Sequence, residues 1–164
     1  MKTCFAILSL GAVLCVWSSV ACAQRAVFLL RHADRLDDSE DTPLSKAGEA
    51  RAQLLARLLK DVGITTIYTS QWQRTIKTAE PLASALKIKP ISIASADHEG
   101  LFKRIRTENR NDIVLIVGHD RSVPQLLRMF GHTEAITIAP TEYDNLFVLV
   151  PKDTGVPTVL HMRY

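Results

Sequence analysis

The hydrophobic positions of the chain alternate between short continuous runs and longer periodic stretches, which predicts strands and helices in turn. Residues 26–30 (AVFLL) and 113–117 (IVLIV) are uninterrupted apolar runs, typical of strands that are buried on both faces. Between them, apolar residues recur every three or four positions from residue 47 to residue 62. This spacing predicts an amphipathic helix that Ser45 caps and that Gly63 ends.

The same pattern continues through the rest of the chain. Further strands are expected at residues 64–69, 91–93, 146–150 and 158–162, and further helices at residues 73–86, 100–108 and 123–130. Pro81 either kinks the second helix or marks its true start, and both readings remain open. Ser122 and Pro124 suit the N-cap and first turn of the last helix, which Gly131 ends. Alternating strands and helices predict an α/β fold, a three-layer sandwich with a mostly parallel sheet and helices on both faces.

Residues 1–23 have the three parts of a secretory signal peptide. Lys2 is the only charge, an apolar run extends to about residue 16, and Ala21-Cys22-Ala23 forms an A-x-A cleavage site. Cleavage after Ala23 leaves a domain of residues 24–164 that is periplasmic or secreted, without stable membrane association. An uncleaved anchor is less favoured because the apolar run is short. Lipid attachment at Cys22 is disfavoured by Ser19, where lipoprotein signals usually have leucine.

Composition removes two classes of function. The three cysteines, Cys4, Cys15 and Cys22, all lie in the predicted leader, so the mature domain has neither a disulfide nor a thiolate nucleophile. Twenty Lys and Arg residues nearly balance 17 Asp and Glu residues, so the charge requires no nucleic-acid partner.

Polar side chains that suit anion binding follow three of the predicted strands. Arg31 and His32 follow the first, Arg74 comes shortly after the second, and His119 follows the strand at 113–117. Because parallel strands end at one edge of a sheet, these residues are expected to lie on a common rim. Arginine forks grip tetrahedral oxyanions, so the substrate should be a phosphate ester or a similar small anion.

In the absence of a thiol, His32 is the candidate nucleophile. Neighbouring arginines should lower its pKa and keep the imidazole neutral, and attack on phosphorus would give a phosphohistidine. His119 is then expected to act as a charged donor to the phosphoryl oxygens. Arg35 either contacts the substrate or is a solvated loop residue. No metal site or cofactor is expected, because the remaining histidines show no ligand spacing: His98, His132 and His161.

Three ordered motifs carry a resemblance to a known family. RHAD at 31–34, TSQWQRTIKTAEPLA at 69–83 and VGHD at 117–120 resemble the histidine phosphatase (phosphoglycerate mutase-like) superfamily, in particular its small bacterial members. The resemblance implies an α/β sandwich and a metal-free reaction in which the histidine of the Arg31-His32 pair is phosphorylated. It also implies that Arg74 is the second phosphate-binding arginine and that His119 is the second histidine of the phosphate pocket.

The proton donor to the leaving group remains open between two carboxylates. A Gly-His-Asp sequence resembles the acid-phosphatase branch, which favours Asp120, whereas mutase-like members take an acidic residue from the segment that here contains Glu99. Asp34 ranks third. The function expected is an exported phosphomonoesterase acting through phospho-His32, on a small substrate such as an envelope sugar phosphate. Alternatives are a protein phosphohistidine phosphatase, a mutase, or an inactive phosphate-binding envelope protein.

Overall fold

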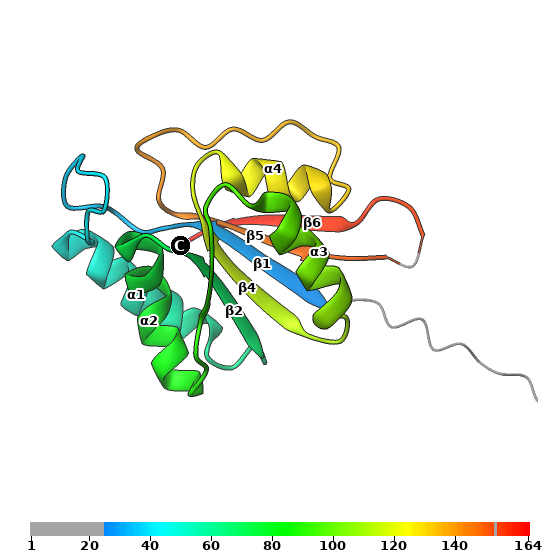
Figure 1. Cartoon of the computed structure of the whole chain (residues 1–164), viewed down its shortest axis with the longest axis horizontal. Helices are drawn as coiled ribbons and strands as arrows, with labels where there is room; N and C mark the ends of the chain where they lie inside the picture. The colour runs from blue at the N-terminus through cyan, green and yellow to red at the C-terminus, as the bar shows by residue number, and fades with distance from the viewer. Residues whose placement is uncertain (1–24, 153) are drawn as a thin grey trace, which may run out of the picture.

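The computed structural model describes residues 25–152 and 154–164, and the predicted leader lies outside them. Helices and strands alternate along this part of the chain as far as β5, which β6 follows directly (Figure 1). The strands are β1 (Ala26–Arg31), β2 (Thr66–Ser70), β3 (Ile91–Ile93), β4 (Ile113–Gly118), β5 (Asn145–Val150) and β6 (Thr158–Arg163). The helices are α1 (Lys46–Leu59), α2 (Gln73–Leu86), α3 (His98–Glu108) and α4 (Ser122–Met129). No helix among the described residues is long and apolar enough to cross a membrane.

The six strands form one mixed sheet in the order β3-β2-β4-β1-β5-β6. The first four strands pair in parallel, whereas β5 is antiparallel to both β1 and β6. Helices α1 and α2 cover one face, and α3 and α4 cover the other (Figure 1). The predicted three-layer α/β class and mostly parallel sheet are confirmed. The alternating pattern did not reveal the antiparallel pairing of β5 with β1 and β6.

The two apolar runs occupy the centre of the sheet. Strand β1 is buried along its whole length, and β4 is buried from its second residue. Their side chains alternate between two hydrophobic cores, one on each face, so every position of β4 and every position of β1 before Arg31 is apolar. Burial of each such side chain contributes about 1.5–3 kcal/mol to folding. This explains why the central strands carry no polar residue before they reach the rim.

Helix ends differ from the prediction where a local hydrogen bond overrides the periodicity. Ser45 caps α1 as expected, accepting a hydrogen bond from the Gly48 amide, but the helix ends at Leu59 and does not reach Val62. A turn through Gly63, with φ of 87°, then leads toward β2. Similarly, α3 starts at residue 98, earlier than predicted, because the Asp97 side chain accepts from the Gly100 amide.

Two open or mistaken predictions concern α2 and α4. Helix α2 runs from Gln73 through Pro81 to Leu86, so the proline neither starts nor ends it. Ser122 is the first residue of α4 and not its N-cap. Its hydroxyl accepts from the backbone amide of His119 at 2.7 Å, so it stabilises the turn that carries this histidine.

Candidate active site

The register of the parallel strands brings the two motif histidines together. Arg31 at the end of β1 is paired with Gly118 at the end of β4, so His32 and His119 follow the paired positions directly. Their ring centroids lie 5.3 Å apart with the planes at 65°. The backbone amide of His32 also donates to the Gly118 carbonyl at 2.9 Å, which extends the pairing one residue beyond the strand.

The His32 ring is buried and held in one tautomer. Only 3% of the residue is exposed, and Nδ1 lies 2.8 Å from the carbonyl oxygen of Ala33. A carbonyl can only accept, so Nδ1 carries the proton and Nε2 keeps its lone pair. Burial lowers the pKa of His32 to about 3, with smaller contributions in the same direction from His119, Arg31 and Arg74. The neutral ring expected from the sequence is therefore present, but desolvation is its main cause; the Ala33 hydrogen bond opposes the shift, and the arginine charges contribute less than that of His119.

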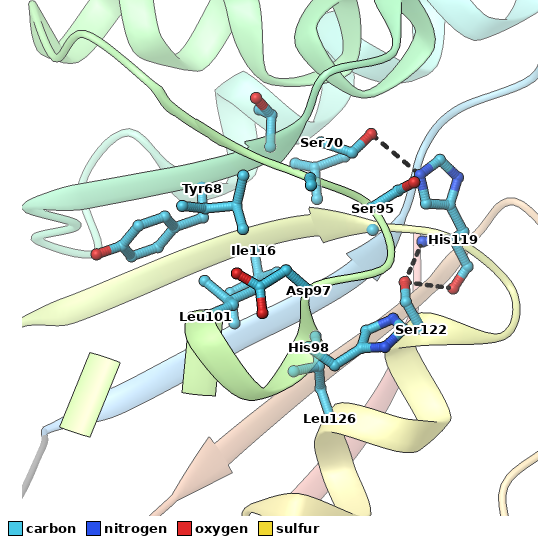
Figure 2. A pocket seen from close by; sticks show the side chains of 15 residues that line it. Tyr68, Ser70, Ser95, Asp97, His98, Leu101, Ile116, His119, Ser122 and Leu126 are labelled. Atoms are coloured by element: carbon cyan, nitrogen blue, oxygen red, sulfur yellow. Dashed lines mark hydrogen bonds between the residues drawn. The ribbon is translucent and has the colours of Figure 1, made fainter. Parts of the chain in front are cut away.

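His119 lies at the edge of a pocket between the ends of β2 and β4 and the starts of α3 and α4 (Figure 2). Its Nε2 is 3.0 Å from the Ser70 hydroxyl, and Ser122 holds its backbone. Burial and the Arg74 charge lower the pKa of His119 to about 4, although Asp120 opposes this shift. Without a bound anion His119 is thus uncharged at neutral pH, so the charged donor expected from the sequence requires that an anion raise its pKa. A bound phosphate dianion would raise its pKa and favour protonation.

Arg31 and Arg74 supply the fixed positive charge of the site. Arg31 is buried, with 4% of the residue exposed, and its guanidinium stacks on the Tyr143 ring at 4.1 Å. Arg74 follows the start of α2, where its Nη1 donates to the Glu40 carbonyl at 2.7 Å and its guanidinium lies 5.3 Å from the Trp72 ring. Burial and the nearby charges of Arg35 and Arg31 lower the pKa of Arg74. The cluster repels itself and would be stabilised by an anion.

Two other predicted site residues, Asp120 and Arg35, lie near enough for their charges to act on Arg74. Asp120 is partly exposed and accepts from the Arg121 amide at 2.9 Å, and its charge acts on both Arg74 and His119. Arg35 is exposed and pairs with Asp38, although its charge reaches Arg74. Asp120 therefore lies beside the cationic cluster.

Glu99 and Asp34 face elsewhere. Glu99 is exposed in the first turn of α3 and lines a separate surface depression with Phe102 and Met129. Of its segment, Asp97 and His98 line the pocket beside His119. The Asp34 carboxylate accepts from Arg51 Nε at 2.7 Å, so it ties the rim to α1.

The sequence did not predict three of the residues that contact the site. Ser70 contacts His119, and the Thr78 hydroxyl accepts from the Ala33 amide at 2.9 Å while donating to the Arg74 carbonyl at 2.7 Å. The ring centroid of Tyr143 is 5.8 Å from that of His32. The first two belong to the quoted motif at 69–83, Ser70 at the end of β2 and Thr78 in α2, and their place in that motif was the available clue. Tyr143 had none, because its approach depends on how β5 pairs.

The lowered pKa values predict that acid destabilises the fold. An unfolded histidine titrates near pH 6.5, whereas His32 and His119 in the folded protein do so near 3 and 4. Below pH 6.5 the unfolded chain binds more protons, so the free energy of unfolding should fall by at most about 1.4 kcal/mol per pH unit for each histidine, and be unaffected by them above pH 6.5. Urea unfolding between pH 7 and pH 5 measures this. His32→Gln should remove about 2 kcal/mol of the difference, and identical pH profiles for this variant and the wild type would contradict the assignment.

Comparisons with known proteins agree with this geometry. The model of the histidine phosphatase superfamily (branch 1) matches residues 27–97, which include Arg31, His32 and Arg74. A curated relative named "Probable phosphoglycerate mutase GpmB", from Yersinia enterocolitica, is 36% identical over 73 residues, or 40% of this chain. The matched segment spans only 34% of that relative's length.

Solved structures match over a larger part of the chain. The protein histidine phosphatase SixA, complexed with tungstate, superposes with a TM-score of 0.66 and 22% identity, covering 84% of this chain and 96% of SixA. A mycobacterial glucosyl-3-phosphoglycerate phosphatase superposes with a TM-score of 0.64 and 12% identity, covering 76% of this chain and 89% of that protein. At these identities the superpositions show the shared α/β fold. The family model, matched over residues 27–97, and the curated relatives support membership of this chain in the histidine phosphatase superfamily.

Proposed function

We propose that this protein is a phosphatase that hydrolyses phosphate monoesters through a phosphohistidine on His32, without a metal or other cofactor. The observation that carries the proposal is the buried His32, whose Nδ1 is turned to the Ala33 carbonyl beside His119. Its Nε2 retains a lone pair, and the charges of Arg31 and Arg74 act on the same ring. A neutral nucleophile among fixed cations suits attack on an anionic phosphoryl group.

In the first step, Nε2 of His32 attacks phosphorus and the bond from phosphorus to the alcohol oxygen breaks. Arg31, Arg74 and His119 stabilise the three remaining phosphoryl oxygens, whose charge changes during transfer. The leaving alcohol oxygen takes a proton from a carboxylic acid, for which we propose Asp120 because its charge acts directly on His119 and Arg74. In the second step water attacks the phosphohistidine, the P–N bond breaks, and the carboxylate accepts the proton from water.

Two substrate classes have specific support. A small phosphorylated substrate, such as an envelope sugar phosphate, fits the proposal that residues 1–23 direct the protein to the periplasm or outside the cell. A protein phosphohistidine is the second candidate, because SixA, a protein histidine phosphatase, is covered over 96% of its length by this chain. Phosphohistidine has a good leaving group and needs little protonation, so the two classes differ in their dependence on Asp120.

The proposal is tested with purified protein and an aryl phosphate in the presence of a chelator. We expect turnover together with an acid-labile, base-stable phosphoryl label that forms on brief exposure to substrate. Absence of both turnover and label would contradict the proposed function, and turnover that disappears with chelator would contradict the metal-free step.

Asp120→Asn separates the roles of the two carboxylates. If Asp120 protonates the leaving group, this variant should still accept the label but turn over an alkyl phosphate about 10²-fold or more slowly. The loss should be smaller with a phosphohistidine peptide. Glu99→Gln is the matched variant and should be close to the wild type, since Glu99 lines a different depression. A wild-type rate for Asp120→Asn with a slow Glu99→Gln would transfer the role to Glu99.

A further inference from the structure

Arg31 is held by the turn 139–142, which precedes the antiparallel strand β5. Its Nη1 donates to the carbonyl oxygens of Ala139, Pro140 and Glu142 at 3.0, 2.8 and 3.1 Å. The guanidinium also stacks on Tyr143, the residue after the turn's close. The turn 139–142 thus contacts one end of the guanidinium, and Tyr143 contacts one face.

These contacts decide which part of the guanidinium is left for an anion. Nη1 has two hydrogens, and three carbonyl oxygens compete for them, so this nitrogen is fully used by the protein. Nε is buried and has no hydrogen-bond partner among the residues that the structure describes. A buried donor of this kind is costly unless it finds an acceptor. The direction of the Nε donor is therefore set by the turn.

The turn is closed by the Glu142 carboxylate, which in turn is held by β6. The Glu142 amide donates to the Ala139 carbonyl at 3.0 Å, and the Ala139 amide donates to Glu142 Oε2 at 2.8 Å. The second carboxylate oxygen, Oε1, accepts from Arg163 Nη2 at 2.9 Å, and Arg163 Nη1 donates to Asp144 at 2.7 Å. One carboxylate oxygen therefore closes the turn and the other joins it to the last strand.

Strand pairing explains why Arg163 can reach this place. Strand β5 starts, and β6 ends, at the edge of the sheet where β1 and β4 end, because Asn145 is paired with Arg163 and Leu30 with Leu146. The Glu142–Arg163 pair is solvent-accessible, with side-chain exposures of 30% and 49%. An ion pair of this exposure contributes little to overall stability, so a stabilising effect alone does not account for it.

We propose that Glu142 and Arg163 are positioning residues for Arg31, fixing the turn 139–142 and through it the anion-binding donors of the guanidinium. The inference rests on the proposed function, since it assigns Arg31 to phosphate binding. The Glu142 side chain contacts Ala139 and Arg163, and the Arg163 side chain contacts Glu142 and Asp144, so both are proposed to act through the turn and not on the substrate. Their effect should therefore appear in the affinity for oxyanions and in KM, with a smaller change in the stability of the fold.

The test compares Arg163→Gln, Glu142→Gln and the double variant with the wild type. In Glu142→Gln the amide oxygen can still accept from Ala139, so the variant removes mainly the link to β6. We expect each single variant to raise the Kd for inorganic tungstate about tenfold and to broaden the NMR signal of the Arg31 Nε–H. The Kd of the double variant should not exceed that of the single variant that binds tungstate more weakly, because both changes break the Glu142–Arg163 pair. Arg163→Lys keeps the positive charge and should restore most of the affinity.

Controls come from a matched ion pair elsewhere. Arg104 and Glu108 form a pair of 2.8 Å on α3, so Arg104→Gln and Glu108→Gln should leave the Kd and the Nε–H signal unchanged. Wild-type values in both Arg163→Gln and Glu142→Gln would overturn the inference, as would additive losses in the double variant. If Glu142→Gln fails to fold, the Arg163→Gln and Arg163→Lys pair decides alone. Tungstate affinity and the NMR signal require no turnover, so failure of the wild type to hydrolyse phosphate esters would contradict the proposed function separately.

Discussion

His32→Ala is expected to lower kcat/KM for an aryl phosphate at least about a thousandfold and to abolish the acid-labile label. In the proposed mechanism the imidazole supplies the electron pair that forms the P–N bond, and no described thiol can replace it, because all three cysteines precede residue 23. The backbone at this position is held by the Gly118 carbonyl and by the Thr78 hydroxyl on the next amide, so the alanine variant should keep the fold. Steady-state kinetics and a melting curve measure the two effects separately.

The control for this variant is His132→Ala, which changes a histidine that follows α4, outside the site. It should keep the wild-type kcat/KM and the full label. Substantial turnover in His32→Ala, or a label that persists in it, would show that another residue is the nucleophile and would contradict the proposed mechanism.

Arg74→Met is expected to lower kcat/KM about 10²–10³-fold while leaving the free energy of unfolding unchanged or raised. In the proposed mechanism the guanidinium is one of the fixed charges that face the phosphoryl oxygens, so its removal should weaken stabilisation of the transition state. In the free protein, however, burial and the charges of Arg35 and Arg31 lower the pKa of Arg74, which shows that its charge is unfavourable there. Loss of that charge relieves the repulsion, so activity and stability should move in opposite directions.

Lys77→Met is the matched control for Arg74→Met. It removes a cation from the same helix three residues further on, where Lys77 is exposed and pairs with Glu80 at 3.0 Å. Its activity should equal that of the wild type. A parallel loss of activity and stability in Arg74→Met would contradict the prediction, because it would indicate a structural role for the arginine.

Much of the site's placement followed from local sequence. The apolar runs at 26–30 and 113–117 indicated central strands, and the residues after them had to lie at the carboxyl edge. The structure brings His32 and His119 to 5.3 Å at that edge, with the charges of Arg31 and Arg74 acting on both rings. Local reasoning succeeded here because a parallel strand delivers its next residue to the same edge wherever it sits in the sheet.

The charge states of His32 and His119 were harder to predict from the sequence. The sequence indicated that arginines lower the pKa of His32, but burial is the larger cause, and His119 is uncharged in the free protein. The extent of desolvation depends on which loops cover a ring, and this has no signature in residue spacing. The relative positions of Asp120 and Glu99 were likewise undecided until the structure placed Glu99 on a separate depression.

The sequence by itself determined the α/β class, the order of the elements and the residues at the ends of the parallel strands. It could do so because burial on one or two faces gives each element a local periodicity of apolar residues. Only the tertiary structure decided that β5 and β6 run antiparallel and bring the turn 139–142, Tyr143 and Arg163 to Arg31. The pairing of β1 with β5 joins residues more than a hundred positions apart, as does the contact from Arg31 to Ala139. No local period records them, so the chain shows which residues reach the rim, and packing alone sets which neighbours hold them there.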